Sequence, residues 1–437
     1  MGIFYNRVKE LDALEQIDHQ SQFSACFTVV MGRRRIGKTE LLRHFIKNKI
    51  STYLFTSRET ETTLCNLWQK KLEKDIGLKI YGSVTTLPEL FEQVLIFSET
   101  KHFILVIDEF QDLQSICPSF FSHLQNLWDT YKSNSKINLI VCGSLYSMMT
   151  KIFQDAREPL FGRSTHQLTL KAFTPSSIKK ILLSHNPHMT PEDLLCLYML
   201  SGGVAKYIFL LMKAGATTKS QMIDYVCQET SPFLTDGKNL LISEMGRDYG
   251  TYFSILKLIS AGLTTQSEID SIIQKNTGAY LKNLEQVFEV IRPIKPILSR
   301  PESRNTRWEI IDSYLKFYFH FIYPNQYMIE LGETEQLKEV ILAGYEQYSG
   351  KTLEQYFTHK IIEENEISQI GGWWDRKSQN EIDIITLHPN EKTGSIYEVK
   401  RQGKKLNLDA LREKASVFTK AHPQYQFMLQ GLSMEDM

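Results

Sequence analysis

The sequence contains one complete motif for binding nucleotide phosphates, at residues 32–39. These residues read Gly-Arg-Arg-Arg-Ile-Gly-Lys-Thr, which fits the pattern G-x-x-x-x-G-K-[ST]. Gly32 and Gly37 allow the backbone to curl so that its N–H groups point at phosphate oxygens. Lys38 can reach the β- and γ-phosphates, and Thr39 offers a hydroxyl to Mg²⁺. An apolar segment precedes the loop and a helical pattern follows it, so the motif predicts binding of ATP with Mg²⁺ at a helix N-terminus.

Two carboxylates follow a second apolar segment, residues 103–107. Asp108 and Glu109 come directly after it, and ligands of open α/β sheets sit at the carboxyl edge of the strands. We expect Asp108 to hold the Mg²⁺ shell, usually through water, and Glu109 to orient or deprotonate the attacking water. A solvated turn that merely caps a buried strand is the weaker interpretation, because the phosphate-binding loop is present.

A third apolar segment, residues 137–142, ends close to Ser144. A hydroxyl at this position could contact the γ-phosphate or the attacking water, although a plain strand-end turn fits the pattern equally well. On the loop that follows, Arg163 could act as a finger on the nucleotide of a neighbouring subunit and neutralise charge in the transition state. Arg157 is a rival for that role, and a surface salt bridge fits either arginine equally well.

A second set of ionisable residues lies in the last ninety residues. Residues 381–385 and 395–400 alternate polar and apolar side chains, so both are predicted to be strands, joined by a turn-rich hairpin loop. Residues i and i+2 of a strand share a face, which would present Asp383, Glu398 and Lys400 to one spot. Two carboxylates can hold Mg²⁺, which polarises a phosphodiester and activates a water, and a lysine can position that water.

The upstream helical pattern could add Glu354 to this second set as a fourth ligand. A different interpretation stays open on the pattern alone. The same residues could form a solvent-facing hairpin held by cross-strand Asp–Lys pairs, each contributing less than about 1 kcal/mol.

The elements that position these residues follow from the periodicity of the chain. Residues 23–172 alternate strand-like and helical patterns, as in a parallel α/β sheet, and residues 1–20 are expected to lie beside the adenine. After a break at Phe173-Thr-Pro175, residues 173–235 contain helical patterns without strands and predict a small helical lid. Glycines and a proline in residues 231–249 are typical of a linker.

Residues 250–325 predict a winged helix, with three helical segments followed by a hairpin whose polar tip spans residues 299–307. Such a module places its third helix in a DNA major groove. Three arginines of the tip could meet phosphates: Arg300, Arg304 and Arg307. The third helix is not basic, so an adaptor between proteins or domains fits the pattern as well as a DNA-binding module does.

The composition of the 437 residues indicates a globular protein of two to four domains. Lys plus Arg and Asp plus Glu each total 50, so any nucleic-acid-binding surface must be local. The six cysteines are scattered without the spacing of a zinc site, which indicates reduced thiols in a cytoplasmic protein. The sequence shows no signal-peptide pattern and no apolar stretch that could span a bilayer, so no membrane association is expected.

The first 230 residues resemble the archaeal-type ATPases, P-loop proteins close to the AAA+ and STAND groups. The matching segments are Phe4–Arg7, the loop at 32–39, and residues 107–110, 142–144, 159–163 and 201–203. The resemblance implies a P-loop NTPase core over residues 1–172, with Arg7 among the residues that contact the nucleotide. Ala205 departs from the family, which usually has proline there, so a nucleotide sensor in the lid is in doubt.

Residues 250–437 resemble the domains that often follow, a winged helix and then a domain like the PD-(D/E)xK nucleases at 340–437. The matching residues are Trp373-Trp-Asp375, Glu381-Ile-Asp383 and Glu398-Val-Lys400, although the proline of the motif is absent. The resemblance implies Asp383, Glu398 and Lys400 as a nuclease triad, with Glu354 as the helix acid. The expected fold class is α/β throughout: a parallel sheet with a helical lid, a winged helix, and a small α/β domain.

Together these features favour an ATP-hydrolysing protein that acts on DNA, with an ATPase that regulates a metal-dependent nuclease-like domain. DNA and further copies of the chain are the expected partners. Two alternatives remain: a STAND-like signalling ATPase whose last two domains only bind a partner or DNA, and a transcription-like regulator that uses the winged helix.

Overall fold

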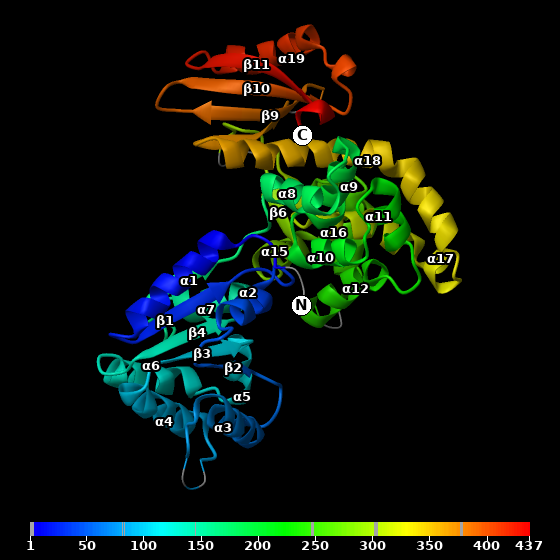
Figure 1. Cartoon of the computed structure of the whole chain (residues 1–437). Coiled ribbons are helices and arrows are strands. Elements are labelled where there is room, and N and C mark those ends of the chain that lie inside the picture. Colours follow the sequence, from blue (N-terminus) through cyan, green and yellow to red (C-terminus); the bar gives the residue numbers. More distant parts are fainter. Residues whose placement is uncertain are drawn as a thin grey trace. The chain divides into compact units, whose positions relative to one another are not determined.

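The computed structural model describes residues 4–80, 82, 84–144, 146–245, 249–300, 305–375 and 379–437. The chain divides into two compact units, Met1–Ala172 and Phe173–Met437, shown in Figure 1 from blue to cyan and from green to red. Each unit has its own sheet and its own buried core. No helix among the residues that the structure describes is long and apolar enough to cross a bilayer.

The first unit is built on a parallel five-stranded sheet with the order β2-β3-β4-β1-β5. Its strands are β1 (Cys26–Met31), β2 (Ser51–Phe55), β3 (Phe103–Asp108), β4 (Ile137–Cys142) and β5 (His166–Thr169). Every residue of β1, β3 and β4 is buried, because parallel sheets carry helices on both faces. The parallel α/β sheet expected from the sequence is therefore confirmed.

Helices connect these strands and supply most of the core of the first unit. They are α1 (Val8–Ser21), α2 (Lys38–Phe45), α3 (Glu61–Ile76), α4 (Leu87–Thr100), α5 (Leu113–Ile116), α6 (Phe120–Tyr131) and α7 (Tyr146–Gln154), with a 3₁₀ turn η1 (Phe110–Asp112). Thr60 and Thr86 cap α3 and α4 by accepting hydrogen bonds from backbone N–H groups of the first turn. Aromatic side chains of η1, α6 and α7 pack against the buried face of β1.

The second unit begins with five helices. They are α8 (Pro175–His185), α9 (Pro191–Ser201), α10 (Ala205–Lys213), α11 (Lys219–Val226) and α12 (Pro232–Met245). Residues 193–201 of α9 are all buried, because α8, α10, α11 and two later helices surround it. A helix that is apolar all round is expected at the centre of a domain, and α9 has that position here.

Three helices and a two-stranded antiparallel ribbon come next: α13 (Tyr249–Ser260), α14 (Gln266–Ile273), α15 (Gly278–Gln286), β6 (Ile291–Ile294) and β7 (Arg307–Ile310). Thr265 forms a capping box with Glu268 at the start of α14, as its place before Glu268-Ile269 suggests. The order of elements is the one predicted for residues 250–325. Arg304 and the three residues before it in the hairpin tip lie outside the described residues, whereas Arg300 is described and exposed.

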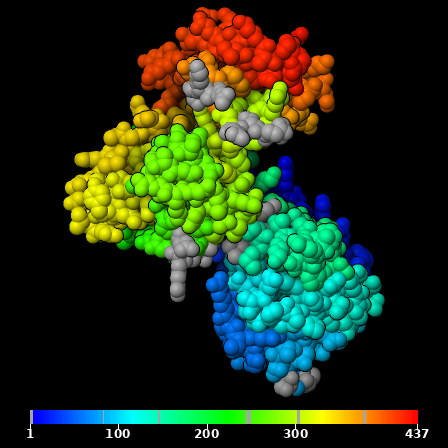
Figure 2. All heavy atoms as spheres, turned by 180° about the vertical axis from the view of Figure 1, so that it is seen from behind, coloured from blue at the N-terminus to red at the C-terminus, as the bar shows by residue number. Residues whose placement is uncertain are grey.

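A short aromatic stretch leads into the longest helix of the protein. It comprises α16 (Ser313–Phe317), a π-helical turn η3 (Tyr318–Ile322), a 3₁₀ turn η4 (Tyr323–Asn325) and α17 (Gln326–Glu330), and α18 (Thr334–Glu364) follows with 31 residues. Figure 2 shows α17 and α18 in yellow on the outer surface of the second unit. α18 packs against α8 and α9 as well as against the last sheet, so it joins the helices to the C-terminal strands.

The C-terminal sheet has the order β11-β10-β9-β8, with β8 (Gln369–Trp374), β9 (Glu381–His388), β10 (Thr393–Lys400) and β11 (Gln426–Ser433). β9 and β10 pair antiparallel, which confirms the predicted hairpin. β11 is parallel to β10, and its crossover contains a 3₁₀ turn η5 (Gly403–Lys405) and α19 (Leu408–Ala421). A final turn, η6 (Met434–Asp436), ends the chain, and α19 buries its apolar face on β9 to β11.

Candidate functional site

The glycine loop at residues 32–39 lies between β1 and α2, at the carboxyl edge of the parallel sheet. Gly37 has a φ of +99°, and Gly32 has a φ of +151°. A Cβ atom on Gly32 would lie 2.9 Å from the carbonyl oxygen of Leu170, closer than real side chains come. Both positions therefore require glycine, because of the backbone angle at Gly37 and because of both angle and space at Gly32.

The Lys38 side chain is folded into this loop. Its Nζ donates hydrogen bonds to the carbonyl oxygens of Gly32, at 2.5 Å, and Arg33, at 3.1 Å. Burial lowers the pKa of Lys38, and the nearby carboxylates Asp108 and Glu109 oppose that shift. The motif predicts that this ammonium binds phosphate oxygens when a nucleotide is present.

Thr39 and Asp108 lie side by side, as the sequence predicts for a magnesium site. The Thr39 hydroxyl donates to Asp108 Oδ2 at 3.1 Å. A hydroxyl and a carboxylate are the hard oxygen donors that Mg²⁺ prefers, and Mg²⁺ takes its remaining ligands from water and phosphate. These two side chains therefore fit an Mg²⁺ ion bound together with a nucleotide.

Two residues that sequence reasoning missed also hold the Asp108 carboxylate. The Tyr53 hydroxyl on β2 donates to Oδ2, and Cys142 Sγ at the end of β4 donates to Oδ1 at 3.0 Å. Burial is the main reason that the pKa values of Tyr53 and Cys142 lie well above their usual ranges, so both groups stay protonated as donors. Of these two residues, only Cys142 could have been found from the sequence, because it ends β4, the strand that pairs with β3.

Glu109 and Ser144 are brought together at the same sheet edge. Glu109 Oε2 accepts hydrogen bonds from the Ser144 hydroxyl at 2.7 Å, from the Ser144 backbone N–H at 3.3 Å, and from Gln111 Nε2 at 2.6 Å. Arg34 Nε in turn donates to the Ser144 hydroxyl at 3.3 Å. Glu109 has a φ of +53°, an uncommon angle for a residue with a side chain, and such angles cluster at functional sites.

Arg7 lies against the phosphate-binding loop, where the resemblance placed a nucleotide contact. Its NH2 donates to the Ile36 carbonyl oxygen at 3.1 Å, and its NH1 pairs with Glu10 at 2.9 Å. Asn6 and Arg7 both have a positive φ, at +50° and +81°. The buried guanidinium therefore joins the start of α1 to the loop that carries Lys38.

The two candidate finger arginines lie away from this cluster. Arg163 NH2 pairs with Asp129 at 3.1 Å, and its NH1 donates to the Phe161 carbonyl oxygen at 3.0 Å. Arg163 lines a cavity of about 480 Å³ together with residues that precede β1 and β5, at the amino ends of those strands. Arg157 pairs with Asp155 and is largely exposed. Both arginines form ion pairs within their own chain, and a role on the nucleotide of a neighbouring subunit stays a prediction.

The predicted residues of the C-terminal domain converge at the ends of β9 and β10. Asp383 Oδ2 accepts a hydrogen bond from the Val399 backbone N–H at 2.9 Å. Glu398 is only 5% exposed, and its Oε1 lies 3.3 Å from Lys400 Nζ and 3.5 Å from Lys414 Nζ. The structure thus adds Lys414 of α19 to the set, a residue that sequence reasoning missed.

Glu354 on α18 completes this cluster. Burial, followed by the charge of Asp383, raises the pKa of Glu354 to about 7. Burial also raises the pKa of Asp383, although the Val399 N–H and the nearby Lys400 oppose that shift. The Asp383 carboxylate therefore lies close enough to Glu354 to contribute to its raised pKa.

Asp383 and Glu398 fit the oxygen chemistry of an Mg²⁺ site. Across the ranges that the structure describes, no group of three or more His, Cys, Asp or Glu residues is arranged to hold a metal ion. Mg²⁺ usually binds proteins through one or two carboxylates and keeps water and substrate phosphates as its other ligands, so a pair is sufficient.

The arginine predicted at the start of the second ribbon strand is engaged within the protein. Arg307 NH1 pairs with Glu381 at 2.8 Å, and its guanidinium lies 4.3 Å from the ring centroid of Trp374. Trp374 Nε1 also donates to Asn305 at 3.0 Å. The ribbon is thereby attached to the edge of the C-terminal sheet, and contact of Arg307 with a phosphate would require these bonds to break.

Comparison with known proteins finds two family matches along the chain. Residues 4–211 match a family described as an ATPase domain predominantly from Archaea, and residues 318–411 match a family of archaeal and bacterial proteins of unknown function, DUF234. The uncharacterized protein MJECL04 of Methanocaldococcus jannaschii is 31% identical over 432 residues, covering 94% of this chain and 92% of its own. This chain belongs to the family of MJECL04, with an archaeal-type ATPase domain.

Solved structures support the same fold for this family member. The Walker-type ATPase PABY2304 of Pyrococcus abyssi is 19% identical, with a TM-score of 0.54 over 72% of this chain and 96% of its own. The ORC2 protein of Aeropyrum pernix, solved in ADPNP–ADP complexes, is 15% identical, with a TM-score of 0.51 over 78% and 96% of the two chains. At these identities the likeness shows the fold alone, and the ATPase domain is therefore the part of the expected function that is shown.

Proposed function

We propose that this archaeal-type ATPase acts on DNA and that its C-terminal domain is a metal-dependent nuclease controlled by the nucleotide state. The observation that carries the proposal is the convergence of Glu354, Asp383, Glu398 and Lys400. These residues come from α18, β9 and β10, and nothing in local sequence forces them into one cluster.

The contacts of the first unit support a hydrolytic ATPase in which each group has one task. Lys38 binds phosphate oxygens, Thr39 and Asp108 hold Mg²⁺, and Glu109 orients the water that attacks the γ-phosphate. Ser144 holds the Glu109 carboxylate through a bond of 2.7 Å, so it acts as a sensor through Glu109.

The charges of the C-terminal cluster support a site built for a cation. Desolvation raises the pKa of Glu354 to about 7 and also raises the pKa of Asp383, so a bound positive charge would favour the ionised forms of both groups. Mg²⁺ bound to Asp383 and Glu398 would supply that charge and an activated water. Lys400, 3.3 Å from Glu398, is placed to orient the water or to stabilise charge that develops on the phosphate.

The helices and ribbon at residues 250–310 support DNA as the substrate. Three helices followed by an antiparallel ribbon are the order of a winged helix, in which α15 would enter the major groove. The link between Arg307 and Glu381 attaches this module directly to the strand that carries Asp383. DNA held by the helices would therefore be delivered beside the nuclease centre.

The decisive experiment incubates the pure protein with Mg²⁺ or Mn²⁺ on supercoiled, linear and single-stranded DNA, with and without ATP. Asp383→Ala should abolish cleavage and leave ATP hydrolysis intact. Asp409→Ala is the matched control, because its side chain is 89% exposed in the same domain and pairs only with its helix neighbour Arg412 among the contacts described. Lys38→Ala should abolish nucleotide binding and, with it, any dependence of cleavage on ATP.

A signalling ATPase of the STAND type is the second candidate. The ion pairs of Glu398 with Lys400 and Lys414 favour it, because a closed salt-bridge network can also serve as structure alone. This candidate predicts nucleotide-dependent assembly without cleavage. Equal DNA integrity with the wild-type protein and with Asp383→Ala, under every metal and nucleotide condition, would favour it over the nuclease.

A further inference from the structure

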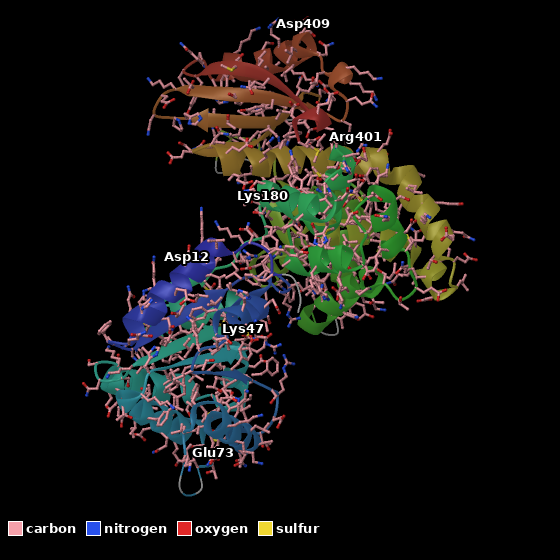
Figure 3. All side chains as sticks on the ribbon, viewed as in Figure 1. Asp12, Lys47, Glu73, Lys180, Arg401 and Asp409 are labelled. Atoms are coloured by element: carbon pink, nitrogen blue, oxygen red, sulfur yellow. The ribbon has the colours of Figure 1, made fainter. Side chains whose placement is uncertain are left out.

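Arg401, the residue after Lys400, connects the end of β10 to two helices outside the C-terminal sheet. Its NH2 donates to both carboxylate oxygens of Glu192, at 2.9 and 2.7 Å, and its NH1 donates to the hydroxyl of Ser349 on α18. The guanidinium also lies 5.5 Å from the ring centroid of Tyr345. Figure 3 shows Arg401 where the C-terminal strands meet α9 and α18.

This ion pair is stronger than an ordinary surface pair. The side chains of Arg401 and Glu192 are 19% and 27% exposed, and one arginine nitrogen contacts both carboxylate oxygens. Charge-assisted bonds that are partly desolvated and held from several sides keep their geometry better than exposed pairs. The backbone position next to Lys400 is therefore fixed by a carboxylate 209 residues away in the chain.

Glu192 lies at the start of α9, and a close backbone contact restricts the chain at the other end of that helix. α9 ends at Ser201, and two residues later a Cβ atom on Gly203 would collide with the backbone of Phe173. Phe173 is the first residue of the second unit, where the chain arrives from the ATPase core. The buried helix thus runs from the entry point of the second unit to the neighbour of Lys400.

Helices α8 and α9 also contact α18, the helix that carries Glu354. The hydroxyl of Tyr198 on α9 is hydrogen-bonded to Nδ1 of His359 at 2.6 Å, and Ser176 on α8 donates to Glu363. His359 and Glu363 lie on α18, one to three turns after Glu354. Residues of α8 and α9 therefore contact Arg401, the neighbour of Lys400, and the part of α18 that follows Glu354.

We propose that Glu192 and Arg401 are positioning residues of the nuclease centre, and that the centre is complete only when α9 holds the end of β10. This inference rests on the proposed nuclease function and adds a requirement to it. The contacts of the Arg401 guanidinium with Glu192 and Ser349 hold Lys400 in its working position. Loss of these contacts therefore lowers the rate of cleavage at saturating DNA. A displacement of about 1 Å at a reacting group can cost about a hundredfold in rate.

The test measures kcat and KM for DNA cleavage in the full-length protein carrying Arg401→Met. We expect kcat to fall at least tenfold, with KM within a factor of two and with ATP hydrolysis unchanged. Arg412→Met is the matched control, because it removes an exposed arginine that pairs with Asp409 on α19 of the same domain. None of the contacts described for Arg412 involves Glu354, Asp383, Glu398 or Lys400, so the control should cleave at the wild-type rate.

Two further variants separate positioning from loss of folding. Glu192→Gln keeps the shape of the side chain and changes a residue outside the C-terminal sheet, and it should also lower kcat. The charge swap Glu192→Arg with Arg401→Glu should restore part of the lost rate. Rescue is expected to be partial, because Lys219 Nζ lies 3.9 Å from Glu192 and would repel an arginine there.

Each outcome decides the inference. Wild-type kcat in Arg401→Met or in Glu192→Gln would overturn it and leave the nuclease function standing. A loss that the charge swap does not restore, accompanied by a lower melting temperature in every variant, would also overturn it in favour of a purely structural pair. Absence of metal-dependent cleavage in the wild-type protein, equal to that of Asp383→Ala, would reject the nuclease function and this inference with it.

Discussion

Replacing Gly32 by alanine tests whether the backbone of the phosphate-binding loop has the freedom that binding requires. Gly32 has a φ of +151°, and an added Cβ would lie 2.9 Å from the Leu170 carbonyl oxygen and 3.2 Å from the side chains of Ile36 and Leu170. The unusual angle alone costs about 1–3 kcal/mol in a residue with a side chain. Forcing an extra carbon into a packed site costs about 1–3 kcal/mol more.

Gly77→Ala provides the matched control in the same unit. Gly77 ends α3 with a φ of +78°, and no atom lies within 4 Å of the position that a Cβ would take. Only the backbone angle is penalised there, by about 1–2 kcal/mol. Both variants therefore lose free energy of folding through the backbone angle. Only Gly32→Ala adds a steric cost and a change in the position of the loop.

Amide hydrogen exchange of β1 measures the stability of the first unit, and titration with ATP measures binding. A loss of about 1.4 kcal/mol speeds exchange about tenfold when exchange follows global opening. We expect exchange of β1 to rise by about 5- to 30-fold in Gly77→Ala and further in Gly32→Ala, with ATP binding lost only in the latter. If Gly32→Ala bound ATP within twofold of the wild-type affinity, the assignment of this loop as a close cradle for phosphates would be wrong.

Three further predictions concern single side chains. Glu109→Gln should still bind ATP but hydrolyse it about 100-fold or more slowly in a phosphate-release assay, because the group that orients water is lost; unchanged turnover would reject that role. If Arg163 serves a neighbouring subunit, mixing Arg163→Ala with Glu109→Gln protein should restore part of the ATPase rate, and no recovery at any ratio would count against it. Burial alone would raise the pKa of Glu309, but Lys316 and Arg292 outweigh burial and leave it below the usual 4.5. Its stabilising effect is therefore present above about pH 4.5 and lost as the pH falls through the lowered pKa, so acid unfolding curves of wild type and Glu309→Gln should converge at low pH.

The sequence predicted the nucleotide site because that site is mostly local. Gly32 to Thr39 are contiguous, and the only long-range step was to place Asp108 at the carboxyl end of a neighbouring parallel strand. Tyr53 could not be found in this way, since its contact with Asp108 depends on the strand order β2-β3-β4, which the sequence does not specify. Gln111 was missed for the opposite reason, because it is close in sequence but reaches Glu109 only through the unusual turn at that residue.

The C-terminal cluster was predicted from the two-residue period of a strand. The residues that this prediction missed lie where a strand period gives no information. The period places Asp383, Glu398 and Lys400 on one face, and the pairing of β9 with β10 brings them together. Lys414 comes from α19, whose position over the sheet depends on a crossover that no local pattern describes. For Arg307 the polar hairpin suggested a phosphate contact, whereas the folded protein uses it to join β7 to Glu381.

Helices α8 to α11, which the sequence predicted as a lid on the nucleotide domain, belong to the second unit and pack against its later helices. This bears on how the ATPase could control the proposed nuclease. α9 contacts α8 and α18, Tyr198 is bonded to His359, and Glu192 is bonded to Arg401, so the helices that follow Phe173 and the C-terminal sheet belong to one compact unit. Closely packed units move as rigid bodies and do not deform continuously. A nucleotide-dependent rotation of the chain at Phe173 would therefore carry the acidic cluster with it as a whole. If the proposed nuclease function holds, control of cleavage would then require no separate transmission element, because α8 and α9 contact both Arg401, next to Lys400, and the part of α18 that follows Glu354.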